Sequence, residues 1–157
     1  MTTDRTEADA PPVARIAQLD DVTRELAERG LGQWQRGELA DARQTLEDLL
    51  ALATDRHHND AVFHALHLLG NVAFSERDFA LSTRLHTQVL DLCTEIGFLG
   101  GAASSLFNLA MVAEAEGDLD TALTQYEAAL DHFSRGGYGA RLPVVEAALT
   151  RLRSRAG

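Results

Sequence analysis

The apolar residues of this chain recur at steps of three and four, which is the spacing of one buried stripe on an α-helix. Near the start, such a stripe runs through Leu19, Val22, Leu26 and Gly30. Similar stripes continue from Val13 to the C-terminus, and no stretch shows the alternation of apolar and polar residues that a strand requires. The pattern therefore predicts an all-α protein.

A second pattern repeats every 40 residues, because chemically equivalent residues occupy the same position in successive stretches of the chain. The clearest sets are Leu26, Leu66 and Leu106; Leu50, Leu90 and Leu130; Gly30, Gly70 and Ala110; and Leu39, Phe79 and Leu119. Fixed periods of this size indicate supersecondary units that stack on one another. We therefore expect one domain over residues 13–157, with repeats at about 21–56, 60–97 and 101–137.

Each repeat is expected to hold two helices joined by a short turn. The first helices are predicted at about Asp21–Arg36, Asp60–Glu76 and Gly101–Glu116, and the second at about Glu38–Ala53, Asp78–Ile96 and Asp118–Ser134. Gly37 and Gly117 stand at turns, where glycine adopts a left-handed backbone at the lowest cost. The acidic residue after each turn (Glu38, Asp78 or Asp118) is expected to cap the helix that follows.

The last apolar stripe predicts a final helix over residues 143–155, starting at Pro143. It would bury Val145, Ala148, Leu149 and Leu152 and leave Arg151, Arg153 and Arg155 on its remaining face. A helix with one apolar and one charged face suits the end of a repeat array, where it covers the last repeat and faces water on the other side. We therefore expect residues 143–155 to be a capping helix.

The repeats resemble the tetratricopeptide repeat family. In the first helices, the family pattern appears as Leu66-x-x-Leu69-Gly70 and as Leu106-x-x-Leu109-Ala110. In the second helices it appears as Ala122-x-x-x-Tyr126, and in weaker form as Ala42-x-x-x-Leu46 and Ser82-x-x-x-His86. The period is longer than the family's usual length of about 34 residues, so the chain is most similar to the long-repeat subgroup of bacterial regulators and peptide receptors.

The resemblance implies a right-handed α-solenoid of three repeats plus the cap, which binds a protein or an extended peptide segment. In this family the concave groove is lined by first-helix residues that stay outside the core. The positions that match this lining, named the candidate-face residues below, are Trp34, His64, His67, Asn71, Phe74, Ser104, Phe107, Asn108, Met111 and Glu114. Arg24 and Glu28 would stand at the N-terminal end of this groove. The alternative is a solvated helix face whose aromatic residues have no role.

Several other residues could carry chemistry. The pair His64-x-x-His67 has the spacing of two metal ligands on one helix, but no third ligand lies at a diagnostic distance in the sequence, so no metal or other cofactor is expected. Some members of the family hold the C-terminal carboxylate of a partner protein with basic side chains. At the matching positions of its last helix this chain has Val144 and Ala148, so this mode of binding is not expected. Cys93 lies among apolar residues and is expected to be a core thiol, without a catalytic role.

Composition and charge narrow the classes of function. The chain has 157 residues, 24 of them acidic against 14 basic, and a formal charge of −10. A protein that binds nucleic acid needs a basic face, and no apolar run reaches the roughly 20 residues that span a bilayer. We therefore expect a cytoplasmic monomer or homodimer with neither a nucleic-acid nor a membrane partner. The acidic segment 1–12, which ends in Pro11-Pro12, is expected to be a disordered tail.

Three functions remain open at this point. The first is an adaptor that binds a protein or peptide. The second is a small enzyme or small-molecule receptor built on the histidines and aromatic residues of the groove, although no catalytic residue can be named. The third is an oligomerisation module.

Overall fold

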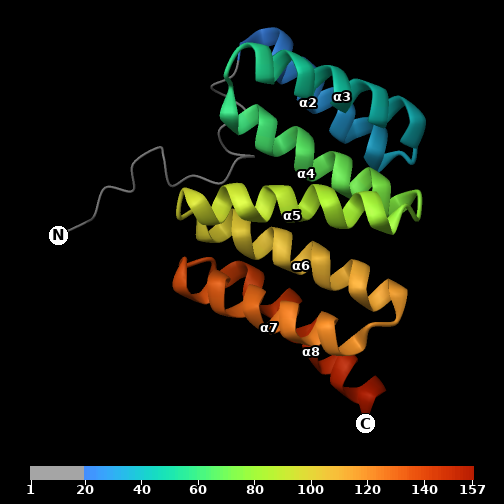
Figure 1. Ribbon diagram of the computed structural model, residues 1–157, viewed down its shortest axis with the longest axis vertical. Helices are drawn as coiled ribbons and strands as arrows, with labels where there is room; N and C mark the ends of the chain where they lie inside the picture. Colours follow the sequence, from blue (N-terminus) through green and yellow to red (C-terminus); the bar gives the residue numbers. More distant parts are fainter. Residues whose placement is uncertain (1–19) are drawn as a thin grey trace, which may run out of the picture. The chain divides into compact units, whose positions relative to one another are not determined.

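The computed structural model describes residues 20–157, which form seven α-helices and one short 3-10 helix (Figure 1). The α-helices are α2 (Asp21–Gln35), α3 (Leu39–Asp55), α4 (Asn59–Ser75), α5 (Phe79–Glu95), α6 (Leu99–Glu116), α7 (Leu119–Arg135) and α8 (Leu142–Ala156), and the 3-10 helix is η3 (Gly139–Arg141). The prediction of an all-α repeat protein with a final helix is confirmed. The predicted tail over residues 1–12 and the start of the predicted domain at residue 13 lie outside the described residues.

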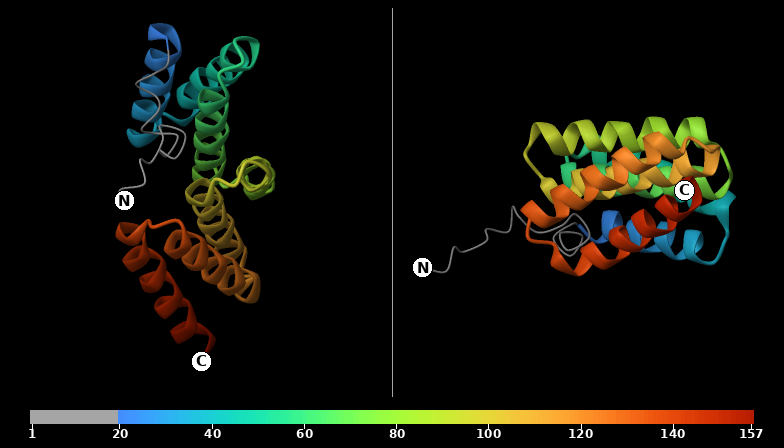
Figure 2. Two further views of the ribbon diagram at one scale, coloured as in Figure 1. Left: turned by 90° about the vertical axis from the view of Figure 1, so that its left-hand side faces the viewer. Right: turned by 90° about the horizontal axis from the view of Figure 1, so that it is seen from below.

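The chain divides into two compact units, one ending at Glu76 and the other beginning at Arg77. In the first unit, α2 packs on α3, α3 packs on α4, and α2 also contacts α4. In the second unit the order of packing is α5 on α6, α6 on α7, and α7 on α8; the course of α7 and α8 can be followed in Figure 2. Helices that are neighbours in sequence therefore pack on one another within each unit. A single domain over residues 13–157 stays a prediction.

The turns between helices repeat every 20 residues. A residue with positive φ stands in each of them, at Gly37, His57, Arg77, Gly97, Gly117 and Gly137. At the first of these turns, the N–H of Glu38 donates to the carbonyl of Gln33 at 2.9 Å and the N–H of Gly37 donates to that of Trp34 at 2.9 Å. These bonds satisfy carbonyls at the helix end in the Schellman arrangement. Equal turns at equal intervals give the helices nearly equal lengths.

The predicted helix caps are correct at two of the three positions. The carboxylates of Asp78 and Asp118 accept hydrogen bonds from the N–H groups of Leu81 and Thr121, each at 3.1 Å. The prediction was wrong for Glu38, which makes no side-chain cap and instead accepts the guanidinium of Arg36 at 2.9 Å. The glutamate side chain is one methylene longer than aspartate, so it reaches the neighbouring arginine.

The core follows the predicted register. The fourth residue of each second helix is fully buried, and so is the residue four positions later. These residues are Ala42, Ser82 and Ala122, followed by Leu46, His86 and Tyr126. In the first repeat, α2 and α3 approach closely at Gly30, where a Cβ atom would lie 2.6 Å from Cδ2 of Leu46. Cys93 is buried as predicted, and burial raises the pKa of its thiol to about 11.

The connection before α6 is shorter than predicted. The predicted helices end at Ile96 and restart at Gly101, which leaves residues 97–100 as the connection. In the structure α6 begins at Leu99 and includes both Gly100 and Gly101. A Cβ atom on Gly100 would lie 2.5 Å from Cζ of Tyr138. Glycine is therefore present here because the Tyr138 ring packs against the helix backbone, and it does not interrupt the helix.

Candidate functional site

The candidate-face residues fall in both units. The first unit holds Trp34 on α2 and His64, His67, Asn71 and Phe74 on α4. The second unit holds Ser104, Phe107, Asn108, Met111 and Glu114, all on α6. Nine of the ten side chains are partly exposed, whereas His64 is buried with 4% of its surface exposed.

In the first unit, Trp34 joins the C-terminal ends of α2 and α4. Its indole Nε1–H donates a hydrogen bond to Oγ of Ser75 at 3.1 Å. This contact places Trp34 beside the end of the helix that carries Phe74. Because the indole N–H is its only donor, Trp34 can offer a ligand only the apolar surface of its ring.

His64 is the buried member of the set. Burial lowers the pKa of its imidazole to about 4, so the ring is neutral at pH 7. Within the described residues its Nε2 atom has no hydrogen-bond partner. A histidine that acts as a general base is usually oriented by a carboxylate or amide, and the described residues place no such group on this nitrogen of His64.

In the second unit, Phe107 and Ser104 are held by local contacts on α6 and α7. The Phe107 ring meets the Tyr126 ring edge-on, with centroids 5.2 Å apart. The hydroxyl of Ser104 donates to the carbonyl of Gly100 at 3.0 Å. Phe107 is thus a partly exposed ring supported from behind by a fully buried one, an arrangement that gives it a fixed orientation.

Glu114 accepts hydrogen bonds from side chains on two other helices. Its Oε2 atom accepts hydrogen bonds from the Tyr126 hydroxyl at 3.1 Å and from Nη2 of Arg151 at 2.8 Å. Its Oε1 atom accepts from Nη1 of Arg155 at 2.9 Å and from Nε of Arg151 at 3.3 Å. The carboxylate therefore joins α6 to both α7 and α8, and its acceptor positions are occupied from within the protein.

The electrostatics of this cluster follow from burial and the two arginines. Burial alone raises the pKa of Glu114, but the hydrogen bonds from Arg151 and Tyr126 and the charges of both arginines lower this pKa overall. Burial, together with the negative charge of Glu114, raises the pKa of Tyr126 to about 12. At pH 7 Glu114 is ionised and Tyr126 carries its proton, as the direction of their hydrogen bond requires.

Sequence reasoning missed the contribution of α8 to this cluster. Arg151, Arg153 and Arg155 were expected on the outer face of the capping helix, yet Arg151 and Arg155 turn to Glu114, and Arg153 pairs with Glu127 on α7 at 2.8 Å. The 40-residue period could have predicted that Arg151 lies on the same face as the candidate-face residues. It places Arg151 in register with Asn71 and Met111, which are both candidate-face residues.

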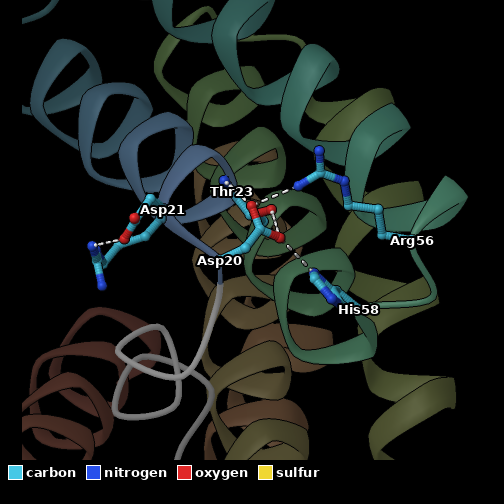
Figure 3. Close-up of polar contacts among 6 residues, drawn as sticks. Asp20, Asp21, Thr23, Arg56 and His58 are labelled. Carbon is cyan, nitrogen blue, oxygen red and sulfur yellow. Dashed lines mark hydrogen bonds and ion pairs between the residues drawn. The ribbon is translucent and has the colours of Figure 1, made fainter.

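A second cluster missed in the sequence lies at the start of α2 (Figure 3). The carboxylate of Asp20 accepts hydrogen bonds from the N–H and hydroxyl of Thr23, at 3.1 and 2.8 Å, and from Nη1 of Arg56 at 2.6 Å. Nδ1 of His58 lies 3.4 Å from the same carboxylate. The bonds from Arg56 and Thr23 lower the pKa of Asp20. The cluster attaches the N-terminus of α2 to the turn between α3 and α4.

The two histidines of the turn between α3 and α4 have different surroundings. His57 is exposed, but His58 is half-buried against Asp20. Across residues 20–157, no three His, Cys, Asp or Glu side chains lie where together they could hold a metal ion. None of the helices described here combines the length and the apolar composition needed to cross a membrane.

The family model for the tetratricopeptide repeat matches residues 61–135, which extend from α4 to the end of α7. No curated protein sequence matches the chain significantly. The matched segment includes His64, His67, Asn71 and Phe74 on α4 and the five candidate-face residues on α6. The chain therefore contains a tetratricopeptide repeat region at residues 61–135, in agreement with the family resemblance of its sequence.

Proposed function

We propose that this protein is an interaction scaffold that binds a protein or an extended peptide segment through the candidate-face residues of its first helices. The observation that carries the proposal is the tetratricopeptide repeat region at residues 61–135, because such regions generally serve as protein-interaction scaffolds. The candidate-face residues outside this region are limited to Trp34, which contacts Ser75 on α4.

The chemistry of the partly exposed side chains supports a peptide ligand. The rings of Trp34, Phe74 and Phe107 offer apolar surface, and aromatic rings with few rotatable bonds are typical anchors of binding interfaces. The amides of Asn71 and Asn108 carry both donors and acceptors, which matches the N–H and C=O groups of an extended peptide backbone. We therefore expect apolar side chains of the ligand to contact the rings and its backbone to pair with the amides.

Glu114 was expected to contact the ligand, but its side chain is engaged within the protein. Its carboxylate oxygens already accept hydrogen bonds from Tyr126, Arg151 and Arg155. A ligand that paired with Glu114 would have to displace at least one of these donors. We therefore do not assign ligand contact to Glu114.

The chain offers its own probe for the test, because Trp34 is its only tryptophan. The folded protein is first screened against an array of peptides, and the affinity of each captured peptide is then measured by calorimetry and by Trp34 fluorescence. Asn71→Ala and Phe107→Ala should each weaken binding by about 1–3 kcal/mol. Arg84→Ala, an exposed position on the second helix α5, is the matched control and should leave the affinity unchanged.

The proposal fails if Asn71→Ala and Phe107→Ala bind a captured peptide as tightly as the unmodified chain while Arg84→Ala does not. Circular dichroism of each variant shows whether its fold is retained, so that a loss of binding is not mistaken for a loss of structure.

A further inference from the structure

One mostly buried carboxylate, that of Glu114, holds the last helix against the helix that carries half of the candidate-face residues. Only 13% of the Glu114 side chain is exposed, and it accepts hydrogen bonds from three side chains on two other helices. An ionised carboxylate in such a position is stable only while those donors remain in place. The arrangement therefore couples the charge of Glu114 to the position of α8.

The rest of the attachment of α8 has a different character. Val145, Ala148, Leu149 and Leu152 form one buried stripe and belong to the same apolar core as Tyr126 and Phe133. Arg151 and Arg155 lie on the adjoining side of the helix and pair with Glu114. The side chain of each arginine is 54% exposed. Apolar contacts thus hold one side of α8, and a single carboxylate on α6 holds the other.

We propose that Glu114 is an electrostatic latch for α8, so that the whole helix opens locally when this carboxylate loses its charge or its arginines. Local opening of a single helix is physically reasonable, because proteins open in cooperative units whose free energies are lower than that of global unfolding. Opening exposes the apolar core that Leu149 and Leu152 share with buried residues of α6 and α7 in the closed state. This opening of α8 does not depend on the proposed peptide binding.

The groups that face Glu114 determine the direction of its response to pH. They are Tyr126 from α7 and Arg151 and Arg155 from α8. Because the pKa of Glu114 is lowered in the folded protein, its contribution to stability is complete at neutral pH. That contribution begins to be lost as the pH falls below the glutamate value of about 4.3, and the loss is complete only below the lower pKa of Glu114 in the folded protein. Acid should therefore release α8 before it unfolds the other helices.

The chain provides a matched control for the latch. Glu127 on α7 also pairs with an arginine of α8, Arg153, at 2.8 Å. Both of those side chains are more than half exposed, so solvent screens the pair and it contributes little. Replacing either glutamate by glutamine removes one negative charge and keeps the side-chain shape. Only the loss of charge at Glu114 should therefore release α8.

The experiment is amide hydrogen exchange on the full chain, resolved by helix. In Glu114→Gln the amides of α8 should exchange about tenfold faster or more at pH 7, whereas in Glu127→Gln they should change by less than about twofold. The amides of α3 should be unchanged in both variants. Lowering the pH from 7 to 3 should accelerate exchange in α8 of the unmodified chain, after correction for the intrinsic pH dependence of exchange, and should have no such effect in Glu114→Gln.

The proposal is overturned if the α8 amides exchange at equal rates in the two glutamine variants. It is also overturned if the α8 amides exchange at the same rate as those of α6 and α7 under all of these conditions. Should Glu114→Gln fail to fold, Tyr126→Phe serves instead, because it keeps the buried ring and removes one donor to the carboxylate. It should raise the α8 exchange rate by a smaller factor, and an unchanged rate in this variant would equally count against the latch.

Discussion

The indole Nε1 of Trp34 donates a hydrogen bond to the hydroxyl of Ser75 at 3.1 Å, across a sequence separation of 41 residues. In the second unit, Nη1 of Arg155 donates to Glu114 at 2.9 Å across the same separation. Both bonds join the C-terminal ends of two first helices, α2 to α4 in one unit and α6 to α8 in the other. The same pair of positions therefore connects successive first helices in each unit.

This relationship identifies α8 structurally. Because Arg155 occupies the position of Ser75 in the 40-residue register, α8 stands where the first helix of another repeat would stand. The side that would meet a second helix carries Glu146 and Thr150, where α6 has Leu106 and Ala110, and both of these α8 residues are exposed. Polar residues on that side explain why α8 acts as a cap.

The close approach of α2 and α3 gives the first prediction. Gly30→Ala should destabilise the protein by about 1–2 kcal/mol, because the new Cβ atom would lie 2.6 Å from the fully buried Leu46 side chain. Gly32→Ala, in the same helix, meets only the flexible end of Arg36 at 3.1 Å. It should be neutral or stabilise by up to about 1 kcal/mol through helix propensity. Urea unfolding measures both, and equal effects would show that the crossing at Gly30 has room to spare.

The second prediction concerns the turn between α3 and α4. His57 has a φ of 56°, although the equivalent residue is glycine at four of the other turns. A left-handed backbone costs an L-residue about 1 kcal/mol relative to glycine. His57→Gly should therefore stabilise the chain by roughly 0.5–1 kcal/mol, and Gly117→Ala, at φ 85°, should destabilise it by about the same amount. Thermal unfolding that moved in the same direction for both variants would contradict this account.

The third prediction concerns the packing of the cap. Leu152 is 1% exposed within the core shared by α7 and α8, so Leu152→Ala should cost about 2–5 kcal/mol. Val144 lies on the same helix but is 51% exposed. Val144→Ala should therefore change the free energy of unfolding by no more than about 0.5 kcal/mol. Denaturant unfolding separates the two, and a similar small effect at both positions would mean that α8 does not share the core.

Much of the fold could be predicted from the sequence because the repeated residues each have a local physical role. Small residues recur at the helix crossings, as at Gly30, and Ala122 and Tyr126 keep their spacing in the second helix. The left-handed turns were harder to predict. The turns at His57 and Arg77 have no glycine at the position with positive φ, so the residue type does not indicate a left-handed backbone there. Only the regular 20-residue spacing of the turns indicates these two positions.

Less of the candidate site could be predicted. Periodicity places a residue on a face of a helix, but it does not say which partner a long polar side chain will choose. The side chains of Arg151 and Arg155 could point into water instead of pairing with Glu114, and the bond from Arg56 to Asp20 spans 36 residues. The contacts between helices in these two clusters therefore have no local signature. The burial of His64 was also not visible, because the same stripe carries the half-buried His67 and Asn71.

The last prediction concerns the effect of the buried His64 on the pH dependence of stability. The ordinary pKa of histidine is 6.5 and the pKa of His64 in the fold is about 4. Between these two values the unfolded chain binds a proton that the folded chain does not, so the free energy of unfolding must fall as the pH is lowered from 6.5 to 4. At pH 5 the loss should be about 2 kcal/mol, and His64→Leu should remove it. Urea unfolding of both proteins at pH 7 and pH 5 makes the comparison. If the stability of the two proteins falls equally between these pH values, His64 is accessible to protons in the folded state, and the neutral, buried imidazole inferred for the candidate face is wrong.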